Sequence, residues 1–435
     1  MDDKVSRYNI EVEYNKGILL YNTLTNNILP ISFKDYAIIE TLMEHLPAFQ
    51  EKFPKIYTAF QQSGFILSSE FDELEYIRLQ NKRCVLLNKD YHLTINPTLD
   101  CNLKCWYCSI GYAGTIYDKE RMSDATIQGL INHIDKLATQ QKANSLLLDW
   151  FGGEPMMYFD KVIRKVTDAA LQSKVSFRQQ MTTNATLLNK ERIQYMKEAH
   201  FDFIQISMDG DERRQNLIKH YPDKRGTYRD VIDNINLLAE TIPSVSICLR
   251  INYDRQTLKD VKNIIEDLSE KSKSCITIDF QRVWQVACTE EMRQLLKEVK
   301  ADFEAAGFRS GFWAYRPLRF KSCYADSRNH YVINYNGKIF KCSARDYGDD
   351  LVLGNLQSTG EIEWNQGIVS KMFAKATFEN ERCESCQLLP LCMGPCIQKN
   401  YEARIAQKPL PCMYQNVEYS LDSFVKKMAE QRNLI

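Results

Sequence analysis

The segment LTINPTLDCNLKCWYC, residues 93–108, places Cys101, Cys105 and Cys108 in a loop directly behind a short run that alternates like a β-strand. Three thiolates in one loop can ligate three irons of a cubane and leave the fourth iron without a protein ligand. Zinc is the alternative, but a structural zinc site needs four ligands, and no fourth Cys or His lies close enough in sequence to complete one. The spacing therefore favours an iron–sulfur cluster with one open iron, where a cofactor or substrate can bind.

The three cysteines lie near the start of a strand–helix alternation that occupies residues 91–308. Six apolar or alternating runs predict strands, with amphipathic stretches between them. These strands are expected at 92–98, 145–151, 176–183, 201–208, 244–251 and 275–282. Repeated βα units indicate a parallel sheet with helices outside it, here an α/β partial (β/α)6 TIM-like barrel. The functional loops of such a barrel follow the carboxyl ends of its strands.

The regions on either side differ from the barrel. Residues 1–90 mix short strand-like and helix-like runs and hold no clustered cysteines, so we expect a small α+β domain there. In residues 309–435 the helical periodicity weakens and the cysteines become dense, which predicts a domain that depends on metal for its fold. The chain is therefore expected to form three domains.

Composition excludes several classes of protein. Hydrophobic residues make up 44% and charged residues 26%, as in ordinary globular proteins. Lys+Arg and Asp+Glu both number 56, so no net field attracts nucleic acid. The N-terminus lacks a secretory pattern, and no apolar run is long enough to cross a bilayer. We therefore expect a cytoplasmic protein with no nucleic-acid or membrane partner, in which clustered cysteines are metal ligands rather than disulfides.

Three motifs follow the first cysteine group at the ends of successive predicted strands: FGGEP with Gly152, Gly153 and Glu154, TTNAT with Asn184, and ISMDG with Ser207 and Asp209. Each motif by itself is ordinary turn chemistry. In this order behind CxxxCxxC, they resemble the radical S-adenosylmethionine (radical SAM) superfamily. The resemblance implies a catalytic [4Fe–4S] cluster on Cys101, Cys105 and Cys108. It also implies that the later motifs bind S-adenosylmethionine, with the GGE motif receiving its methionyl amino group.

Two basic residues are further candidates for the cofactor site. Relatives often carry an Arg about a dozen residues after the Ser of the fourth-strand motif, and here that spacing reaches Lys219. Lys can meet a carboxylate as a point charge, but not as a bidentate fork. Arg250 and Asn252 alternate with apolar neighbours on the fifth strand, so both can face the barrel interior. An Arg that is solvated or salt-bridged is the alternative reading of Arg250.

A second group of seven cysteines lies near the C-terminus. The spacing of these cysteines resembles that of the SPASM domain of peptide-modifying radical enzymes. Its members are Cys323, Cys342, Cys383, Cys386, Cys392, Cys396 and Cys412. The resemblance implies two auxiliary [4Fe–4S] clusters. Cys383, Cys386, Cys392 and Cys412 would ligate one fully, and Cys323, Cys342 and Cys396 would ligate the other.

The second auxiliary cluster is thus one protein ligand short. Sulfatase-converting relatives supply another cysteine where this chain has Pro317. Either one iron is open or a distant residue such as Cys275 or Cys288 closes the site, although lone cysteines are usually small buried apolar residues. Those relatives also carry an Asp after the second cysteine of the group, where this chain has Ser343. Ser is a poor base at neutral pH, so formylglycine formation becomes the alternative rather than the leading function.

Together the two resemblances imply a maturase of ribosomally made peptides that installs a thioether or carbon–carbon cross-link. The precursor peptide would be its partner, and flavodoxin or ferredoxin its electron donor. Residues 1–90 loosely resemble a winged-helix module that binds a precursor leader by adding a strand to a sheet edge, and a cap that packs on the barrel is the alternative. A non-enzymatic alternative for the whole chain is a metal-stabilised scaffold that binds peptides.

Overall fold

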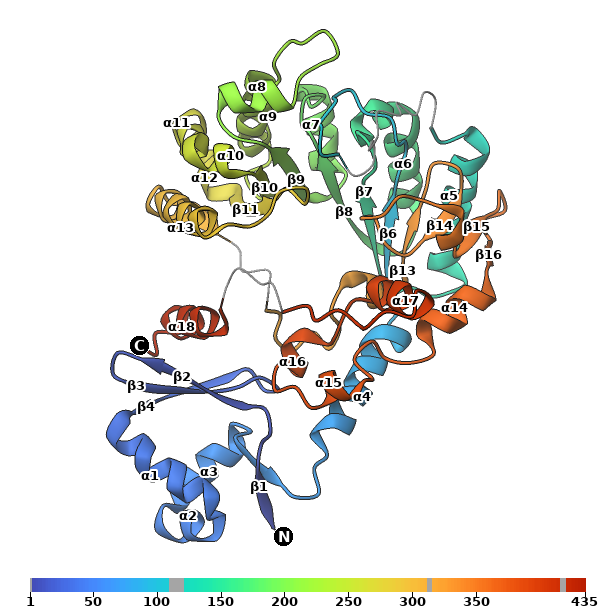
Figure 1. The fold of residues 1–435 in the computed structure, drawn as a ribbon. Coiled ribbons are helices and arrows are strands. Elements are labelled where there is room, and N and C mark those ends of the chain that lie inside the picture. Colours follow the sequence, from blue (N-terminus) through green and yellow to red (C-terminus); the bar gives the residue numbers. More distant parts are fainter. Residues whose placement is uncertain (1, 109–120, 311–314, 415–419) are drawn as a thin grey trace. The chain divides into compact units, whose positions relative to one another are not determined.

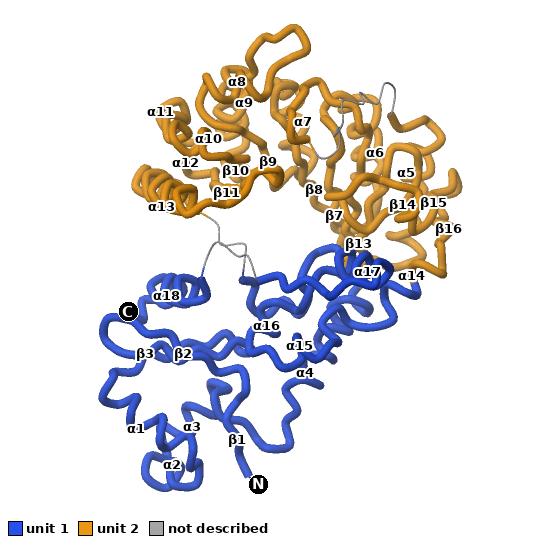
Figure 2. Tube along the Cα trace, in the orientation of Figure 1, with its two compact units in different colours: residues 1–88, 312–328, 370–435 blue, residues 89–311, 329–369 orange. Residues whose placement is uncertain are grey.

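The structure is a computed structural model that describes residues 2–108, 121–310, 315–414 and 420–435. The described chain divides into two compact units, which Figure 2 shows in blue and orange. Unit 1 contains residues 1–88, 312–328 and 370–435, and unit 2 contains residues 89–311 and 329–369. The C-terminal cysteine-rich region is therefore shared between the units, and most of it belongs to the same unit as the N-terminal residues.

Unit 2 is built on one sheet of eleven strands, ordered β12-β11-β10-β9-β8-β7-β6-β13-β14-β15-β16 (Figure 1). All six predicted barrel strands are present as neighbouring parallel strands. The sheet is open, because its end strands β12 and β16 are not neighbours in the order. The strands are β6 (Asp90–Ile95), β7 (Ser145–Trp150), β8 (Ser176–Thr183), β9 (Phe201–Met208), β10 (Ser246–Tyr253), β11 (Ile276–Arg282), β12 (Arg309–Ser310), β13 (His330–Ile333), β14 (Lys338–Phe340), β15 (Gly354–Leu356) and β16 (Ile362–Trp364).

Polar side chains at the first turns of several helices after the strands cap free backbone N–H groups. Ser123, Asn189, Asp211, Asp254 and Thr289 each accept such a hydrogen bond. The helices are α5 (Asp124–Thr139), α6 (Arg164–Gln172), α7 (Lys190–Glu198), α8 (Glu212–Ile218), α9 (Tyr228–Thr241), α10 (Arg255–Asp260), α11 (Ile264–Asp267), α12 (Glu270–Cys275) and α13 (Glu290–Ala305). Unit 2 thus has the α/β partial barrel expected from the sequence.

The sequence prediction did not include β13 to β16. Strand β13 pairs in parallel with β6, and β14 to β16 continue the sheet antiparallel. Strands as short as three residues carry too little periodicity to be recognised from sequence. Their position lengthens the sheet beside the strand that precedes Cys101.

Unit 1 brings both ends of the chain together. A three-stranded sheet, β2-β3-β4, has a core against the helices α1, α2 and α3 and a second core that includes α18. Its elements are β1 (Asp3–Val5), β2 (Asn9–Tyr14), β3 (Gly17–Asn22), β4 (Asn27–Ser32), α1 (Phe33–Glu44), α2 (Leu46–Lys52), α3 (Pro54–Gln62), β5 (Ile66–Ser68), α4 (Glu73–Lys82), α15 (Glu381–Glu384), α16 (Leu389–Cys392), α17 (Ile397–Ile405) and α18 (Leu421–Gln431). Helix α14 (Gln366–Phe373) spans the boundary between the units. No helix of the described chain is both long and apolar enough to span a membrane.

Candidate functional site

The loop that carries Cys101 is held against the loop after β7 by backbone hydrogen bonds. Gly153 N donates to Thr98 O at 3.1 Å, and Glu154 N donates to Asp100 O at 2.8 Å. Gly152 has a φ of +119°, which favours glycine. In this structure the two glycines allow the loop after β7 to lie against the backbone of the cysteine loop. The GGE motif therefore positions the loop that carries the three cysteines.

Replacing Gly153 with Ala is expected to displace the cysteine loop, because the new Cβ would lie 2.0 Å from Asp100 O. Such overpacking typically costs about 1–3 kcal/mol of unfolding free energy, and we also expect weaker binding of S-adenosylmethionine. Thermal unfolding and equilibrium dialysis measure the two effects. Gly367→Ala is the matched control, since its Cβ would make only an ordinary contact, 3.4 Å from Asn365 Oδ1. Equal effects in the two variants would contradict this account.

Glu154 is buried, and its carboxylate is bound to the end of the neighbouring strand. Its Oε1 accepts hydrogen bonds from Met156 N at 3.0 Å and Thr183 Oγ1 at 2.7 Å, and its Oε2 accepts from Asn184 N at 2.8 Å. Burial raises the pKa of Glu154, and these hydrogen bonds oppose the shift. Glu154 therefore fixes the β8 loop, and its contact with the methionyl amino group stays a prediction.

Asn184 continues this connection back to the first cysteine. Its Nδ2 donates to Asn102 Oδ1 at 2.9 Å and lies 3.9 Å from Cys101 Sγ. Asn102 Nδ2 in turn donates to Thr186 Oγ1 at 2.9 Å. The ends of β6, β7 and β8 thus form one hydrogen-bonded assembly around Cys101.

Ser207, Asp209 and Lys219 come together at the end of β9. Lys219 Nζ donates to Ser207 Oγ at 2.8 Å and lies 3.7 Å from Asp209 Oδ1. Asp209 and Lys219 are both buried. Burial raises the pKa of Asp209, and the Lys219 ammonium opposes that shift. Arg250 pairs with Ser207 on the adjacent strand, and its Nε donates to Asn252 Oδ1 at 3.3 Å.

Two members of this cluster, Tyr107 and Asn252, were not among the predicted binding residues. Tyr107 OH donates to Asp209, with Oδ1 at 2.6 Å and Oδ2 at 2.7 Å, and Asn252 Nδ2 donates to Tyr107 OH at 3.1 Å. Tyr107 lies between Cys105 and Cys108, so its bond to Asp209 ties the cysteine loop to β9. The sequence feature that could have indicated Tyr107 is the aromatic residue inside CxxxCxxC.

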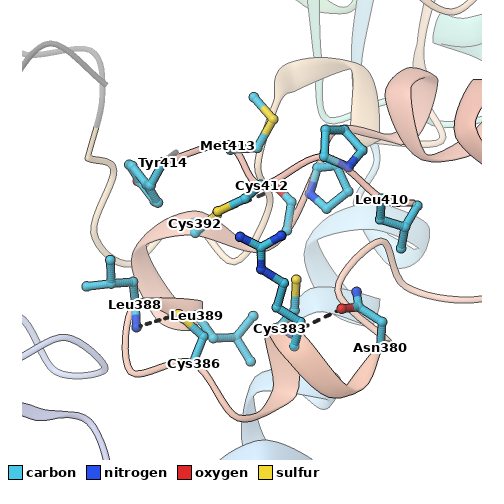
Figure 3. Close-up of a pocket in the computed structure, with 14 residues that line it drawn as sticks. Asn380, Cys383, Cys386, Leu388, Leu389, Cys392, Leu410, Cys412, Met413 and Tyr414 are labelled. Atoms are coloured by element: carbon cyan, nitrogen blue, oxygen red, sulfur yellow. Dashed lines mark hydrogen bonds between the residues drawn. The ribbon is translucent and has the colours of Figure 1, made fainter. Parts of the chain in front are cut away.

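A second candidate site lies in unit 1, where Cys383, Cys386, Cys392 and Cys412 line one pocket (Figure 3). Asn380 caps α15 by accepting from Cys383 N at 3.1 Å. Apolar residues, including Leu388 and Tyr414, form much of the remaining wall. The pocket therefore presents four sulfur donors in a largely apolar setting.

The buried carboxylate of Asp326 joins two further cysteines of the second group. Its Oδ2 accepts from Cys323 N at 3.0 Å, and its Oδ1 accepts from Ile397 N, the residue after Cys396, at 2.8 Å. Cys323 and Cys396 thus lie in neighbouring segments of unit 1, whereas Cys342 belongs to unit 2. No sequence motif indicates Asp326, because its link to Ile397 spans 71 residues of the chain.

Several of these sulfurs accept backbone hydrogen bonds, as iron-bound thiolates do. Leu103 N donates to Cys101 Sγ, Ala344 N to Cys342 Sγ and Leu388 N to Cys386 Sγ, each at 3.4 Å. By contrast, the Sγ atoms of Cys275, Cys288 and Cys392 have carbonyl oxygens as partners. All fourteen cysteines are free of disulfides.

These groups suit clusters in their donor chemistry. No three described His, Cys, Asp or Glu side chains are spaced to hold a single metal ion. A cubane distributes its thiolates over separate irons, so they stand farther apart than around one zinc ion. Cys101, Cys105 and Cys108 belong to one loop, and Cys383, Cys386, Cys392 and Cys412 line one pocket. The residues present therefore fit one three-thiolate and one four-thiolate cluster.

Residues 95–278, which contain the cysteine loop and the motifs after it, match the family model of the radical SAM superfamily. The chain contains a radical SAM domain. It is therefore an enzyme, which removes the alternative of a non-catalytic scaffold. Radical SAM domains bind a [4Fe–4S] cluster and S-adenosylmethionine, and the assignment of Cys101, Cys105 and Cys108 as the cluster ligands stays a prediction.

Known proteins resemble this radical SAM enzyme over most of its length. The radical SAM cyclopropyl synthase TigE of Paramaledivibacter caminithermalis is 22% identical over 382 residues, which are 80% of this chain and 77% of TigE. The structure of anSMEcpe with bound AdoMet and Cp18Cys peptide has a TM-score of 0.54 and 18% identity, covering 78% of this chain and 97% of that one. Streptococcus suis SuiB bound to the precursor peptide SuiA has a TM-score of 0.52 and 16% identity, covering 97% and 100%. Both structures show a shared fold.

Proposed function

We propose that this radical SAM enzyme is a peptide maturase that installs a thioether or carbon–carbon cross-link in a ribosomally made precursor. The observation that carries the proposal is the four-cysteine pocket of unit 1, on the same chain as the radical SAM domain. Its spacing resembles the SPASM pattern of peptide-modifying enzymes. Two enzymes of similar fold have structures with peptides bound, which supports a peptide substrate.

When bound, the cluster and S-adenosylmethionine supply a 5′-deoxyadenosyl radical that takes hydrogen from the peptide. The chain's own residues would hold the cofactor beside the cysteine loop. Lys219 would meet its carboxylate as a point charge, and its ammonium lies beside Ser207 and Asp209. The hydrogen bond from Tyr107 to Asp209 would keep the loop in register with β9. Closed packing around these groups would exclude water from reactive intermediates.

The auxiliary clusters complete the proposal. Cys383, Cys386, Cys392 and Cys412 would hold one [4Fe–4S] cluster, as their shared pocket supports. The SPASM resemblance assigns Cys323, Cys342 and Cys396 to the other, and within unit 1 Asp326 links the segments of Cys323 and Cys396. These clusters would accept an electron from the modified peptide, and flavodoxin or ferredoxin would reduce the enzyme.

Residues 1–90 are proposed to bind the precursor leader. The sheet of this region has two edge strands, β2 and β4, and a peptide strand can add to an exposed edge. Strand β4 contains Pro30, which has no N–H to donate, so β2 is the better acceptor.

Co-expression with the peptides encoded next to the gene, followed by mass spectrometry, tests the function. The expected product has lost two hydrogen atoms, carries a cross-link that survives in fragment ions, and forms only with intact Cys101, Cys105 and Cys108. Oxidation of Ser to an aldehyde gives the same mass change, so aldehyde trapping separates formylglycine formation from a cross-link. An unmodified peptide together with absence of 5′-deoxyadenosine would contradict the proposal.

A further inference from the structure

One side chain in the wall of the four-cysteine pocket has a buried hydrogen-bond donor that the protein itself does not use. Asn380 lines the pocket together with Cys383, Cys386, Cys392 and Cys412. Its Nδ2 atom is buried and has no hydrogen-bond partner among the described residues. An unmet buried donor costs about 1–3 kcal/mol of unfolding free energy. Such an atom therefore calls for an explanation, and a polar ligand of the pocket would supply its acceptor.

The orientation of the Asn380 amide follows from its other contact. Asn380 Oδ1 accepts a hydrogen bond from Cys383 N at 3.1 Å, which Figure 3 shows as a dashed line. A backbone N–H can only donate, so the amide atom that meets it is the oxygen. The second atom is then the nitrogen, which has two hydrogens to donate. The unpartnered atom is thus a donor, and the reversed orientation of the amide is excluded.

Apart from the cysteines, few groups of the pocket can donate to sulfur. Leu388 N donates to Cys386 Sγ at 3.4 Å. The Tyr414 hydroxyl donates to a backbone carbonyl at 3.3 Å. Arg382 also lines the pocket, but it is an exposed residue, so solvent and salt screen its charge. Asn380 therefore provides a buried side-chain donor in a wall that is otherwise largely apolar.

The donor chemistry of the pocket indicates which acceptor this amide would meet. Four thiolates fit a [4Fe–4S] cluster, whose sulfurs carry negative charge and accept N–H hydrogen bonds. The reduced cluster carries one more negative charge than the oxidised cluster, so an N–H donor stabilises the reduced form more. Hydrogen bonds to the sulfurs therefore raise the reduction potential of a cluster.

We propose that Asn380 Nδ2 donates a hydrogen bond to the [4Fe–4S] cluster of the four-cysteine pocket and raises its reduction potential. This inference rests on the proposed function, in which an auxiliary cluster accepts an electron from the modified peptide. In that transfer the peptide loses one electron and the cluster gains it. A higher potential of the cluster favours this direction. The hydrogen bond that fixes Asn380 Oδ1 on Cys383 N also holds the Nδ2 donor in the pocket wall.

The test compares Asn380→Ser and Asn380→Asp in the anaerobically reconstituted protein. Ser and Asp both keep an oxygen that can cap Cys383 N, but neither has the amide donor. In Asn380→Ser the ratio of oxidised to reduced pocket cluster at a fixed potential should rise about 10-fold. For one electron this equals a potential lower by about 59 mV. Asn380→Asp should lower the potential further, because its carboxylate adds negative charge beside the cluster.

A redox titration followed by electron paramagnetic resonance measures the potential. The signal of the pocket cluster is the one that disappears when all four pocket cysteines are replaced with Ala. Asn189→Ser and Asn189→Asp are the matched controls. Asn189 also caps a helix, by accepting from Arg192 N at 2.9 Å, but it belongs to unit 2. Both control variants should keep the wild-type potential of the pocket cluster.

An unchanged potential in Asn380→Ser, or an equal shift in Asn189→Ser, would overturn the proposal. If the Ser variant does not bind the cluster, Asn380→Asp decides the result, because Asp has the size of Asn. An unchanged potential in Asn380→Asp would then overturn the proposal. A spectrum that stays the same after replacement of the four pocket cysteines would instead refute the auxiliary cluster of the proposed function.

Discussion

Replacing Cys101, Cys105 and Cys108 together with Ala is expected to abolish 5′-deoxyadenosine formation. The three thiolates are the ligands that the CxxxCxxC spacing predicts for the cluster, so their loss should prevent it from assembling. Anaerobically reconstituted wild-type protein should bind roughly 12 iron atoms in three cubanes, and the variant roughly 8. Iron analysis and chromatography of the nucleoside products measure the two effects.

Cys84→Ala is the control for this experiment, because Cys84 is a free cysteine outside both groups. It should keep the full iron content and activity. Residual 5′-deoxyadenosine in the triple variant would show that another site cleaves the cofactor. A wild-type iron content near four would contradict the three-cluster model.

The second large effect is expected in a variant in which Cys383, Cys386, Cys392 and Cys412 are all replaced with Ala. About four irons should be lost, and the N-terminal sheet should loosen as well. Leu388 and Tyr414 line the cysteine pocket and also pack on the core cluster that contains Tyr21 of β3. Tyr414 stacks on Tyr315 at 4.7 Å, and Tyr315 packs against Phe424 at 4.8 Å. The pocket wall and the sheet thus share one hydrophobic core. Loss of the pocket's cluster should therefore lower the local stability of the sheet.

Hydrogen–deuterium exchange of peptides from β2 and β3 measures this coupling. We expect exchange to be at least ~10-fold faster in the four-cysteine variant, a loss of about 1.4 kcal/mol in local stability. The triple variant of the first cysteine group serves as the control. It also loses one cluster, but from unit 2, and should leave exchange of β2 and β3 unchanged. Unchanged exchange in the four-cysteine variant would refute the shared core.

Structural features that depend on residues close together in the sequence could be predicted from it. The six barrel strands were correct because buried parallel strands form apolar runs with helical segments between them. Ser207, Asp209 and Lys219 lie together at the end of β9, and their binding of the cofactor stays a prediction. The short strands β13 to β16 were missed because three or four residues show no clear period.

Other features depend on contacts between segments that are distant along the chain. The carboxylate of Glu154 is engaged by the β8 loop, although the motif alone indicates a ligand contact. Asp326 carries no sequence motif, and its partner Ile397 lies 71 residues farther along the chain.

The sequence alone predicted an iron–sulfur role for the cysteine loop, because the cysteine spacing in residues 93–108 is local and does not depend on the fold. It also predicted the parallel strands that carry the loop, since apolar runs alternate with amphipathic stretches along residues 91–308. Only the tertiary structure decided that residues 1–88 and the four-cysteine pocket form one unit. The reason is physical: short elements with few apolar residues cannot build separate cores, so they share one across the two ends of the chain.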